Sequence, residues 1–270
     1  MAKILQIAKD ASFAAGKLIL SLQGKTEVFH KNSNFNLVTQ ADKESEKIII
    51  SMIQSAMPDS VILSEETLWQ QNITAKQLWI IDPLDGTNNF AHSIPHYSIS
   101  IAYAEHGIVK AAVIYDPNRD ELFTAESGMG AFCNGERISV SQSKSLKDAV
   151  IATGFFYERG EMMQNTLFSI YRLLKENIQG IRRMGSAALD LSWVACGRYE
   201  GYFEYMLSPW DFAAGMLLVR EAGGVCSDRE GFELELESRG VICSNKFISE
   251  QLLELVAWSE VSKMEKLVLR

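Results

Sequence analysis

The sequence lacks the features that mark several large classes of protein. Its 270 residues include only 5 prolines and 4 cysteines, and they are 47 % hydrophobic and 22 % charged. That composition is ordinary for a globular chain, and it excludes disorder, collagen and coiled coil as descriptions of the whole. No apolar run reaches the roughly 18 residues of a membrane-spanning helix. Asp10 interrupts the N-terminal segment before the apolar core of a signal peptide can develop. We therefore expect a globular, cytoplasmic protein that does not associate with membranes.

Cysteine and histidine are too scattered to form the common metal or redox motifs. No C-x-x-C pair is present, which argues against a zinc ribbon or a dithiol redox site. We expect the cysteines to be small buried hydrophobic side chains. They are Cys133, Cys196, Cys226 and Cys243. The sequence also has no H-E-x-x-H, G-x-S-x-G or G-x-x-x-x-G-K-[ST] motif, so it does not resemble a zincin, a serine hydrolase or a P-loop nucleotidase.

Positive charge is in short supply. The chain has 26 Lys+Arg against 34 Asp+Glu, for a formal net charge of -8, and its isoelectric point is about 5.2. A protein whose main work is to neutralise nucleic-acid phosphates carries the opposite balance. We therefore expect no nucleic-acid-binding surface, and the positions of the carboxylates become the question of interest.

The apolar pattern predicts alternating helices and strands. Helical spacing covers residues 3–22 and 43–57, and Pro58 stops the second helix. Strands are predicted at 78–81, 98–103, 108–115 and 121–123, with a hairpin at Asn134-Gly135. The second half predicts strands at 149–153, 199–205 and 241–243 and helices at 162–177, 187–196, 212–222 and from about 249. With no linker or internal repeat, this pattern indicates one α/β domain over 1–270, in two continuous halves of roughly 1–145 and 146–270, with mixed, largely antiparallel sheets.

The segment Asp82-Pro83-Leu84-Asp85-Gly86-Thr87 carries the strongest chemical signal. Two carboxylates flank a proline directly after the apolar run 78–81, so they lie where a buried strand ends. Two negative charges at such a place are costly unless a cation holds them. Oxygen ligands without His or Cys favour Mg²⁺ or Mn²⁺ over zinc. The alternative is an Asx turn and a helix N-cap, which explains one aspartate and Thr87 but not the other aspartate.

Three further carboxylates follow apolar or helix-start signals. Asp42 begins a helix after Leu37-Val38, Glu65 follows the apolar run ending at Leu63, and Asp211 begins a helix after Pro209. Each of them taken singly is more often a cap than a ligand, because aspartate is common at helix starts.

Taken together, these segments resemble the inositol monophosphatase family. The matching motifs are D-P-L-D-G-T-N-N-F, S-E-E, L-V-T-Q-A-D, G-S-A-A-L-D and P-W-D-F-A-A-G, in the family's order from about residue 31 to 224. The nearest likeness is to bacterial members. The resemblance implies a layered α-β-α-β-α sandwich like that of the inositol monophosphatases and fructose-bisphosphatases, with the metal site in the first half and the second half completing the substrate pocket. It also implies a homodimer.

The resemblance further implies a site for two to three Mg²⁺ ions. Glu65 and Asp82, with the backbone carbonyl of Leu84, correspond to the first ion's ligands. Asp82, Asp85 and Asp211 correspond to the second ion's ligands, and Glu65 helps hold a third ion through water. The family's behaviour also implies inhibition by Li⁺.

The same resemblance assigns catalytic and substrate-binding residues. Asp42, Thr87 and Glu65 correspond to the residues that orient and activate the attacking water. The implied substrate contacts are Asp85, Gly86, Thr87, Gly185, Ser186, Ala187, Glu204 and Asp211. Lys31 matches a lysine near the site. We predict direct in-line attack by a metal-bound water on inositol-1-phosphate or a related sugar or polyol monophosphate, without a phosphoenzyme.

Two departures from the family pattern and several alternatives remain. Ser64 replaces a usual glycine, and Asn88 replaces a usual threonine or serine. Within the superfamily, the alternatives are a fructose-1,6-bisphosphatase, a 3′-phosphoadenosine nucleotidase and a histidinol-phosphate phosphatase. The nucleotidases usually carry Lys-Glu where this chain has Asn88-Asn89. A non-catalytic regulatory protein that keeps the fold is the alternative of a different class. Asp190 either contacts substrate or pairs with Arg182 or Arg183, and His92 and His96 are structural or line the rim.

Overall fold

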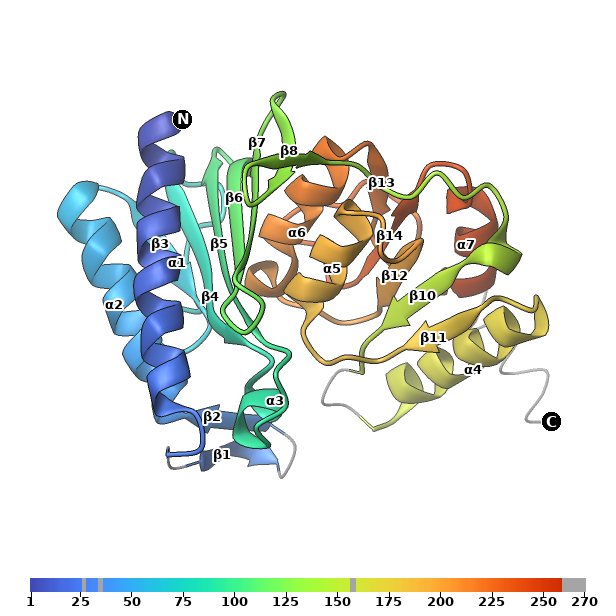
Figure 1. Cartoon of the computed structure of the whole chain (residues 1–270), viewed down its shortest axis with the longest axis horizontal. Coiled ribbons are helices and arrows are strands. Elements are labelled where there is room, and N and C mark those ends of the chain that lie inside the picture. Colours follow the sequence, from blue (N-terminus) through green and yellow to red (C-terminus); the bar gives the residue numbers. More distant parts are fainter. Residues whose placement is uncertain (26–27, 34–35, 156–158, 259–270) are drawn as a thin grey trace.

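The helices and sheets of this chain stack as five layers. The computed structural model describes residues 1–25, 28–33, 36–155 and 159–258. Two helices, a seven-stranded sheet, two further helices, a five-stranded sheet and two outer helices follow one another from left to right in Figure 1. The layered α-β-α-β-α sandwich with mixed sheets is therefore confirmed.

The first layer consists of α1 (Ala2–Leu22) and α2 (Gln40–Ala56), which pack on each other and on the seven-stranded sheet. Helix α1 buries Ala8, Ala11, Ala15 and Ile19, which recur every three or four residues and so form one stripe. Because three of these four residues are alanine, the helix can approach the sheet closely. Helix α2 also buries polar side chains, and these point toward the strand ends that form the site.

The seven-stranded sheet has the order β3-β4-β5-β6-β7-β8-β9, and only the β3–β4 pair is parallel. Its strands are β3 (Val61–Ser64), β4 (Leu78–Asp85), β5 (Ser98–Glu105), β6 (Ile108–Asp116), β7 (Glu121–Glu126), β8 (Gly130–Cys133) and β9 (Glu136–Ile138). Strand β4 is buried over its whole length because helices cover both faces of the sheet. The predicted hairpin at Asn134-Gly135 is confirmed, and both residues have positive φ angles of 49° and 82°.

The middle layer consists of α5 (Ala187–Ala195) and α6 (Pro209–Glu221), which lie between the two sheets. Helix α6 buries eight successive residues from Phe212 to Val219. A helix that is apolar all round is typical of one that is covered on every side. The first turns of both helices and the end of β4 line the same cavity, and this is where the candidate site lies.

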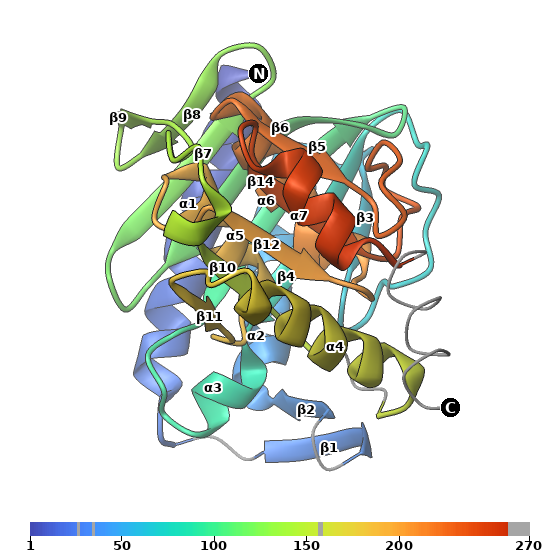
Figure 2. The ribbon, with the colours of Figure 1, turned by 90° about the vertical axis from the view of Figure 1, so that its right-hand side faces the viewer.

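The five-stranded sheet has the order β11-β10-β12-β14-β13. Its strands are β10 (Val150–Thr153), β11 (Gly180–Arg182), β12 (Gly201–Glu204), β13 (Gly224–Ser227) and β14 (Val241–Asn245). The outer helices α4 (Glu161–Lys175) and α7 (Ser249–Val256) cover its far face and lie in front in Figure 2. The remaining short elements are β1 (Val28–Ser33), β2 (Asn36–Thr39), α3 (Thr87–Ala91) and a 3₁₀ turn (Leu146–Asp148).

Several sequence expectations are corrected at the level of single residues. Helices α2 and α6 begin at Gln40 and Pro209, three residues before the apolar pattern starts, because their first turns are polar or capped. Cys226 and Cys243 are buried as predicted, but Cys133 and Cys196 are only half-buried. Trp79 is a core residue, whereas Trp193 and Trp210 are half-buried. Within the described ranges, no helix is long and apolar enough to span a membrane.

Candidate active site

A cavity of about 480 Å³ opens where the end of β4 meets the N-termini of α5 and α6. Most of the site residues predicted from the sequence line it. They are Glu65, Asp82, Asp85, Gly86, Thr87, Gly185, Ser186, Ala187, Glu204 and Asp211. Asp42 and Leu84 lie behind this lining, and the side chain of Lys31 falls outside the described part of the chain. The structure thus brings four carboxylates from three separate segments, Glu65, Asp82 with Asp85, and Asp211, to the lining of a single cavity.

Strand β4 presents its two aspartates through a local irregularity. Its register with β5 shifts between Asp82 and Asp85, because Pro83 has no N–H group to continue the ladder. The Leu84 N–H donates to Asp82 Oδ1 at 3.0 Å. Gly86 follows with φ of +100°, a conformation that favours glycine, and a Cβ atom there would lie 3.0 Å from the His96 carbonyl oxygen. The chain can therefore turn sharply from Asp85 into α3.

Asp85 bridges the two halves of the molecule. Its Oδ2 accepts hydrogen bonds from the Ser186 hydroxyl at 2.6 Å and from the Ala188 N–H at 2.7 Å. Ser186 is the N-cap of α5, so this carboxylate lies at the positive end of that helix. The hydrogen bonds hold the Gly185-Ser186-Ala187 turn against β4, which explains why segments a hundred residues apart line one cavity.

Asp42 and Asp211 each occupy the third position of a helix. The Asp42 Oδ2 accepts from the Thr39 N–H at 2.7 Å at the start of α2, and the Asp211 Oδ2 accepts from the Ser208 N–H at 2.6 Å at the start of α6. Both are the carboxylates of capping boxes. The capping role that the sequence suggested for these residues is therefore real, and it coexists with their place at the site.

Asp42 does not line the cavity itself but is connected to it by a hydrogen bond from Thr87. The Thr87 hydroxyl donates to Asp42 Oδ1 at 2.7 Å and also approaches the Leu84 carbonyl oxygen at 3.1 Å. Asp42 itself is fully buried. A hydroxyl that donates to a carboxylate keeps lone pairs that can accept from a third group. Thr87 can thus relay a proton from the cavity to Asp42, while the Leu84 carbonyl lies beside this relay.

Mutual repulsion and burial raise the pKa of every aspartate in this group. Burial, followed by the charge of Glu65, raises the pKa of Asp82 and of Asp211 well above the ordinary value. Burial raises the pKa of Asp85 and of Asp42 to about 6, against hydrogen bonds that lower it. Burial and the neighbouring charges therefore disfavour the ionised form of each aspartate, and a bound cation would favour it.

The residues present fit a hard divalent cation. The donors are carboxylates only, with no His or Cys, which is the ligand set of Mg²⁺ or Mn²⁺. Asp85 and Asp211 use Oδ2 in the hydrogen bonds described above, so their Oδ1 atoms take no part in those bonds. Among the described residues, no three His, Cys, Asp or Glu side chains already converge as in an occupied ion site. The fit consequently rests on the chemistry of the donors and on their shared cavity.

A further carboxylate in the cavity lining belongs to Glu204, the last residue of β12. Its Oε2 accepts from the Tyr202 hydroxyl at 2.6 Å, and a Cβ atom on Gly154 would lie only 1.8 Å from that oxygen. Gly154 is therefore required for Glu204 to lie where it does. Burial raises the pKa of Glu204 to about 7, against the Tyr202 hydrogen bond and the charge of Arg183, which lower it. Motif reasoning missed Gly154 and Tyr202, and it named Arg183 only as a possible partner of Asp190.

Asp190 and His96 take different positions relative to the cavity. Asp190 lines it and is 1 % exposed, and no hydrogen-bond partner is found for its Oδ1 among the described residues. Asp190 also interacts with the charge of Arg183, which opposes the rise in its pKa caused by burial, so its place in the lining is compatible with contact to substrate and with the predicted pairing to Arg183. His96 is buried, and its Nε2 lies 4.0 Å from Asp190 Oδ1. Its ring lies edge-on to Trp193, and burial followed by the charge of Arg119 lowers its pKa to about 4. His96 is absent from the residues that line the cavity, which favours the structural alternative over a place at the rim.

Known proteins share this architecture. The model of the inositol monophosphatase family matches residues 1–260. An inositol-1-monophosphatase of Rhizobium meliloti (strain 1021) is 40 % identical over 255 residues, which cover 94 % of this chain and 96 % of the relative. The Nus factor SuhB of Escherichia coli (strain K12) is 41 % identical over 256 residues, with 94 % and 95 % covered. A solved IMPase of Thermotoga maritima has a TM-score of 0.88 at 36 % identity and covers 98 % of this chain and 99 % of its own. The chain therefore belongs to the inositol monophosphatase family.

Proposed function

We propose that this protein is a Mg²⁺-dependent phosphomonoesterase that hydrolyses inositol-1-phosphate and related sugar or polyol monophosphates. The observation that carries the proposal is that one cavity is lined by a group of mutually repelling carboxylates and by a separately held glutamate. Asp82 interacts with the charges of Glu65, Asp85 and Asp211, and Glu204 accepts a hydrogen bond from the Tyr202 hydroxyl. The first group would form a carboxylate end that holds cations and a phosphate, and Glu204 would form an end that receives a hydroxyl-rich leaving group.

The carboxylate end would hold two to three Mg²⁺ ions, with Mn²⁺ as a substitute. Glu65, Asp82 and the Leu84 carbonyl would hold one ion, and Asp82, Asp85 and Asp211 would hold another. When bound, these ions would lower the pKa of water, neutralise the phosphoryl oxygens and stabilise the leaving oxygen. The family as a whole is metal-dependent, which supports this assignment.

Thr87 and Asp42 would supply the proton path. The Thr87 hydroxyl donates to Asp42, so its free lone pairs would accept a hydrogen bond from the attacking water. Glu65 would hold the same water from the other side. The hydrogen bonds from Thr39 keep Asp42 oriented toward Thr87. In-line attack then needs no covalent intermediate on the protein.

The rest of the cavity would position the substrate. The backbone N–H groups of Gly86 and Thr87 would donate to the phosphate, and the turn Gly185-Ser186-Ala187 would face the polyol ring. Glu204 would accept hydrogen bonds from ring hydroxyls. Arg183 also lines this end and would balance the charge of Glu204. These contacts favour a small substrate rich in hydroxyl groups.

Two other functions remain as alternatives. A fructose-1,6-bisphosphate, 3′-phosphoadenosine or histidinol-phosphate substrate would use the same metal end with a different leaving group. A regulatory role gains support from the relative named as a Nus factor. The complete carboxylate set favours a working phosphatase, although a protein can do both. Cytoplasmic location, homodimeric assembly and Li⁺ sensitivity stay predictions.

The test is phosphate release from a panel of these monoesters, with and without Mg²⁺. We expect turnover of inositol-1-phosphate that requires Mg²⁺. The Asp85→Asn variant should lose more than about 100-fold, because even the outer partners of metal ligands cost 10- to 100-fold when removed. Asp148→Asn, which changes an exposed aspartate, is the matched control. Wild-type protein that releases no phosphate from any monoester at millimolar Mg²⁺ would refute the proposal.

A further inference from the structure

We propose that Glu46 is a positioning residue that sets the affinity of the metal site by holding the turn that carries Glu65. The ion is taken to be the one of the proposed function, so the inference deepens that function. Glu46 lies on α2, 2 % exposed, and it is absent from the cavity lining. Its partners are on a different segment of the chain.

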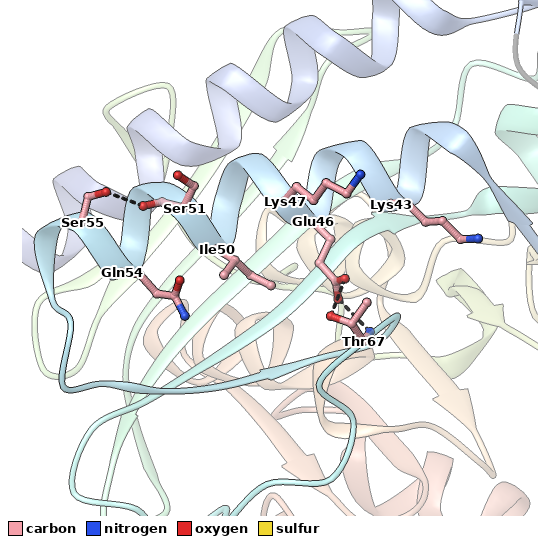
Figure 3. Close-up of a pocket in the computed structure, with 8 residues that line it drawn as sticks. All are labelled: Lys43, Glu46, Lys47, Ile50, Ser51, Gln54, Ser55 and Thr67. Atoms are coloured by element: carbon pink, nitrogen blue, oxygen red, sulfur yellow. Dashed lines mark hydrogen bonds between the residues drawn. The ribbon is translucent and has the colours of Figure 1, made fainter.

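Three hydrogen bonds join Glu46 to the turn that follows Glu65. The Glu46 Oε1 accepts from the Glu66 N–H at 3.2 Å and from the Thr67 N–H at 3.1 Å. The Oε2 accepts from the Thr67 hydroxyl at 2.8 Å. Figure 3 shows the Glu46 side chain extending from α2 to Thr67 on the loop beside it. One carboxylate therefore satisfies both backbone N–H groups that immediately follow the metal-ligand candidate.

Two further backbone hydrogen bonds fix the turn and Glu65 itself. The Ser64 N–H donates to the Leu68 carbonyl at 3.2 Å, which closes the turn. The Glu65 N–H donates to the Ile81 carbonyl at 3.3 Å, and Ile81 directly precedes Asp82. The backbone of Glu65 is thus tied to β4 on one side and, through its next two residues, to Glu46 on the other. Loss of the hydrogen bond to β4 or of those to Glu46 would move the Glu65 carboxylate relative to Asp82.

Glu46 belongs to a polar face of α2 that forms hydrogen bonds to the segments that carry the site residues. Ser45 and Glu46 lie three and four positions after Asp42, so both share one side of the helix with it. Asp42 receives the Thr87 hydroxyl, and the Ser45 hydroxyl donates to the Pro83 carbonyl at 2.8 Å. The contacts of Asp42 and Ser45 hold β4 and the turn that follows it, and the hydrogen bonds of Glu46 hold the turn that follows β3. One helix face thereby sets the separation between Glu65 and the β4 aspartates.

Two variants of Glu46 separate the effect of side-chain length from the effect of charge. In Glu46→Gln the side chain keeps its length and one carbonyl oxygen for the two N–H groups, but it loses the charge. In Glu46→Asp the charge remains, but the carboxylate lies about 1.5 Å farther back, one carbon–carbon bond. Glu44→Gln is the control, because Glu44 is on the same helix and pairs with exposed Lys47 at 3.0 Å. Mn²⁺ binding to the full chain is titrated by electron paramagnetic resonance, and amide exchange is followed at residues 66 and 67.

We expect Glu46→Asp to weaken Mn²⁺ binding about tenfold, at the low end of the 10- to 100-fold cost of removing an outer partner of a ligand. The same variant should accelerate exchange of the Glu66 and Thr67 amides and raise the Mg²⁺ needed for half-maximal activity, while the substrate KM at saturating Mg²⁺ stays unchanged. Glu46→Gln should stay within about threefold of wild type, because both N–H bonds persist. Glu44→Gln should match wild type.

The opposite order of the two variants would overturn the inference, since it would assign the effect to charge. Unchanged Mn²⁺ affinity in Glu46→Asp would overturn it as well. These outcomes are separate from failure of the proposed function. A protein that binds Mn²⁺ in the expected order but hydrolyses no monoester would refute the phosphatase and leave the role of Glu46 standing.

Discussion

Replacement of Glu204 by glutamine should remove a defined part of the pH dependence of folding in the metal-free protein. Glu204 is 7 % exposed and accepts from the Tyr202 hydroxyl at 2.6 Å. Glutamine has the same shape and keeps an acceptor for that hydroxyl. The substitution therefore removes the charge with little change in packing.

The pKa of Glu204 gives the sign and size of the effect. Burial raises it from the ordinary 4.5 to about 7. Between these values the folded chain holds a proton that the unfolded chain has released, so the free energy of unfolding falls as the pH rises. The full stability is present below pH 4.5 and is lost as the pH passes 7. The loss is about 3 kcal/mol above pH 7, and roughly 2 kcal/mol of it develops between pH 5 and pH 8.

Urea unfolding in EDTA at pH 5 and pH 8 measures this difference. Loss of the Glu204 charge also reduces the rise in the pKa of Asp190 and of Asp211, which burial mainly causes. This change acts in the same direction, so the variant should lose at least about 2 kcal/mol less stability than wild type between the two pH values. Glu237→Gln removes the same charge from an exposed position and should follow wild type. Equal pH dependence in Glu204→Gln and wild type would refute the buried, protonated state of Glu204.

Two further predictions concern the turn at the end of β4. Gly86→Ala should lower the free energy of unfolding by roughly 2 kcal/mol or more, because it combines a positive φ with a Cβ 3.0 Å from the His96 carbonyl oxygen. Gly24→Ala, which has a positive φ but open space, should cost only about 1 kcal/mol when both variants are compared by urea unfolding. Thr87→Val should reduce kcat by at least about 100-fold, the range of lost proton transfer, with Mn²⁺ binding retained. Thr87→Ser should restore activity, and a Thr87→Val enzyme with normal kcat would contradict the relay to Asp42.

The long elements of this fold could be predicted because their apolar residues recur at a fixed spacing. Ala8, Ala11, Ala15 and Ile19 follow the helical period, and α1 begins and ends within one residue of the prediction. The strands β11 and β13 were missed because each has only three or four residues, at the edge of the second sheet. Strands that short contain too few alternations for a period to show.

The aspartates of the site could be predicted because their signals are local. Asp82 and Asp85 flank a proline at a strand end, and Asp42 and Asp211 lie three residues after a threonine or serine, which is the capping-box pattern. The residues that support the site from other segments could not be predicted from local patterns. Gly154 matters because Glu204 lies against it fifty residues later, and that contact exists only once β10 and β12 pair.

Glu46 illustrates the same limit from inside a correctly predicted helix. In the sequence it is one acid in a polar stretch, and a solvated helix face would look the same. Its burial depends on the Glu66-Thr67 turn, whose N–H groups supply the hydrogen bonds that a buried carboxylate requires. A spacing rule along one helix cannot contain that information, because it comes from a segment twenty residues away.

Three aspartates of this site share an arrangement that explains how part of the chain's excess of acidic residues is buried. Asp42, Asp85 and Asp211 each place an oxygen on the N–H groups near a helix N-terminus. Those termini carry partial positive charge, which offsets part of the cost of burying the carboxylates. Their orientation is therefore set by backbone hydrogen bonds when the chain folds. Burial, followed by the charge of Glu65, raises the pKa values of these groups in spite of those hydrogen bonds, and a bound cation would neutralise the negative charge that the helices do not offset.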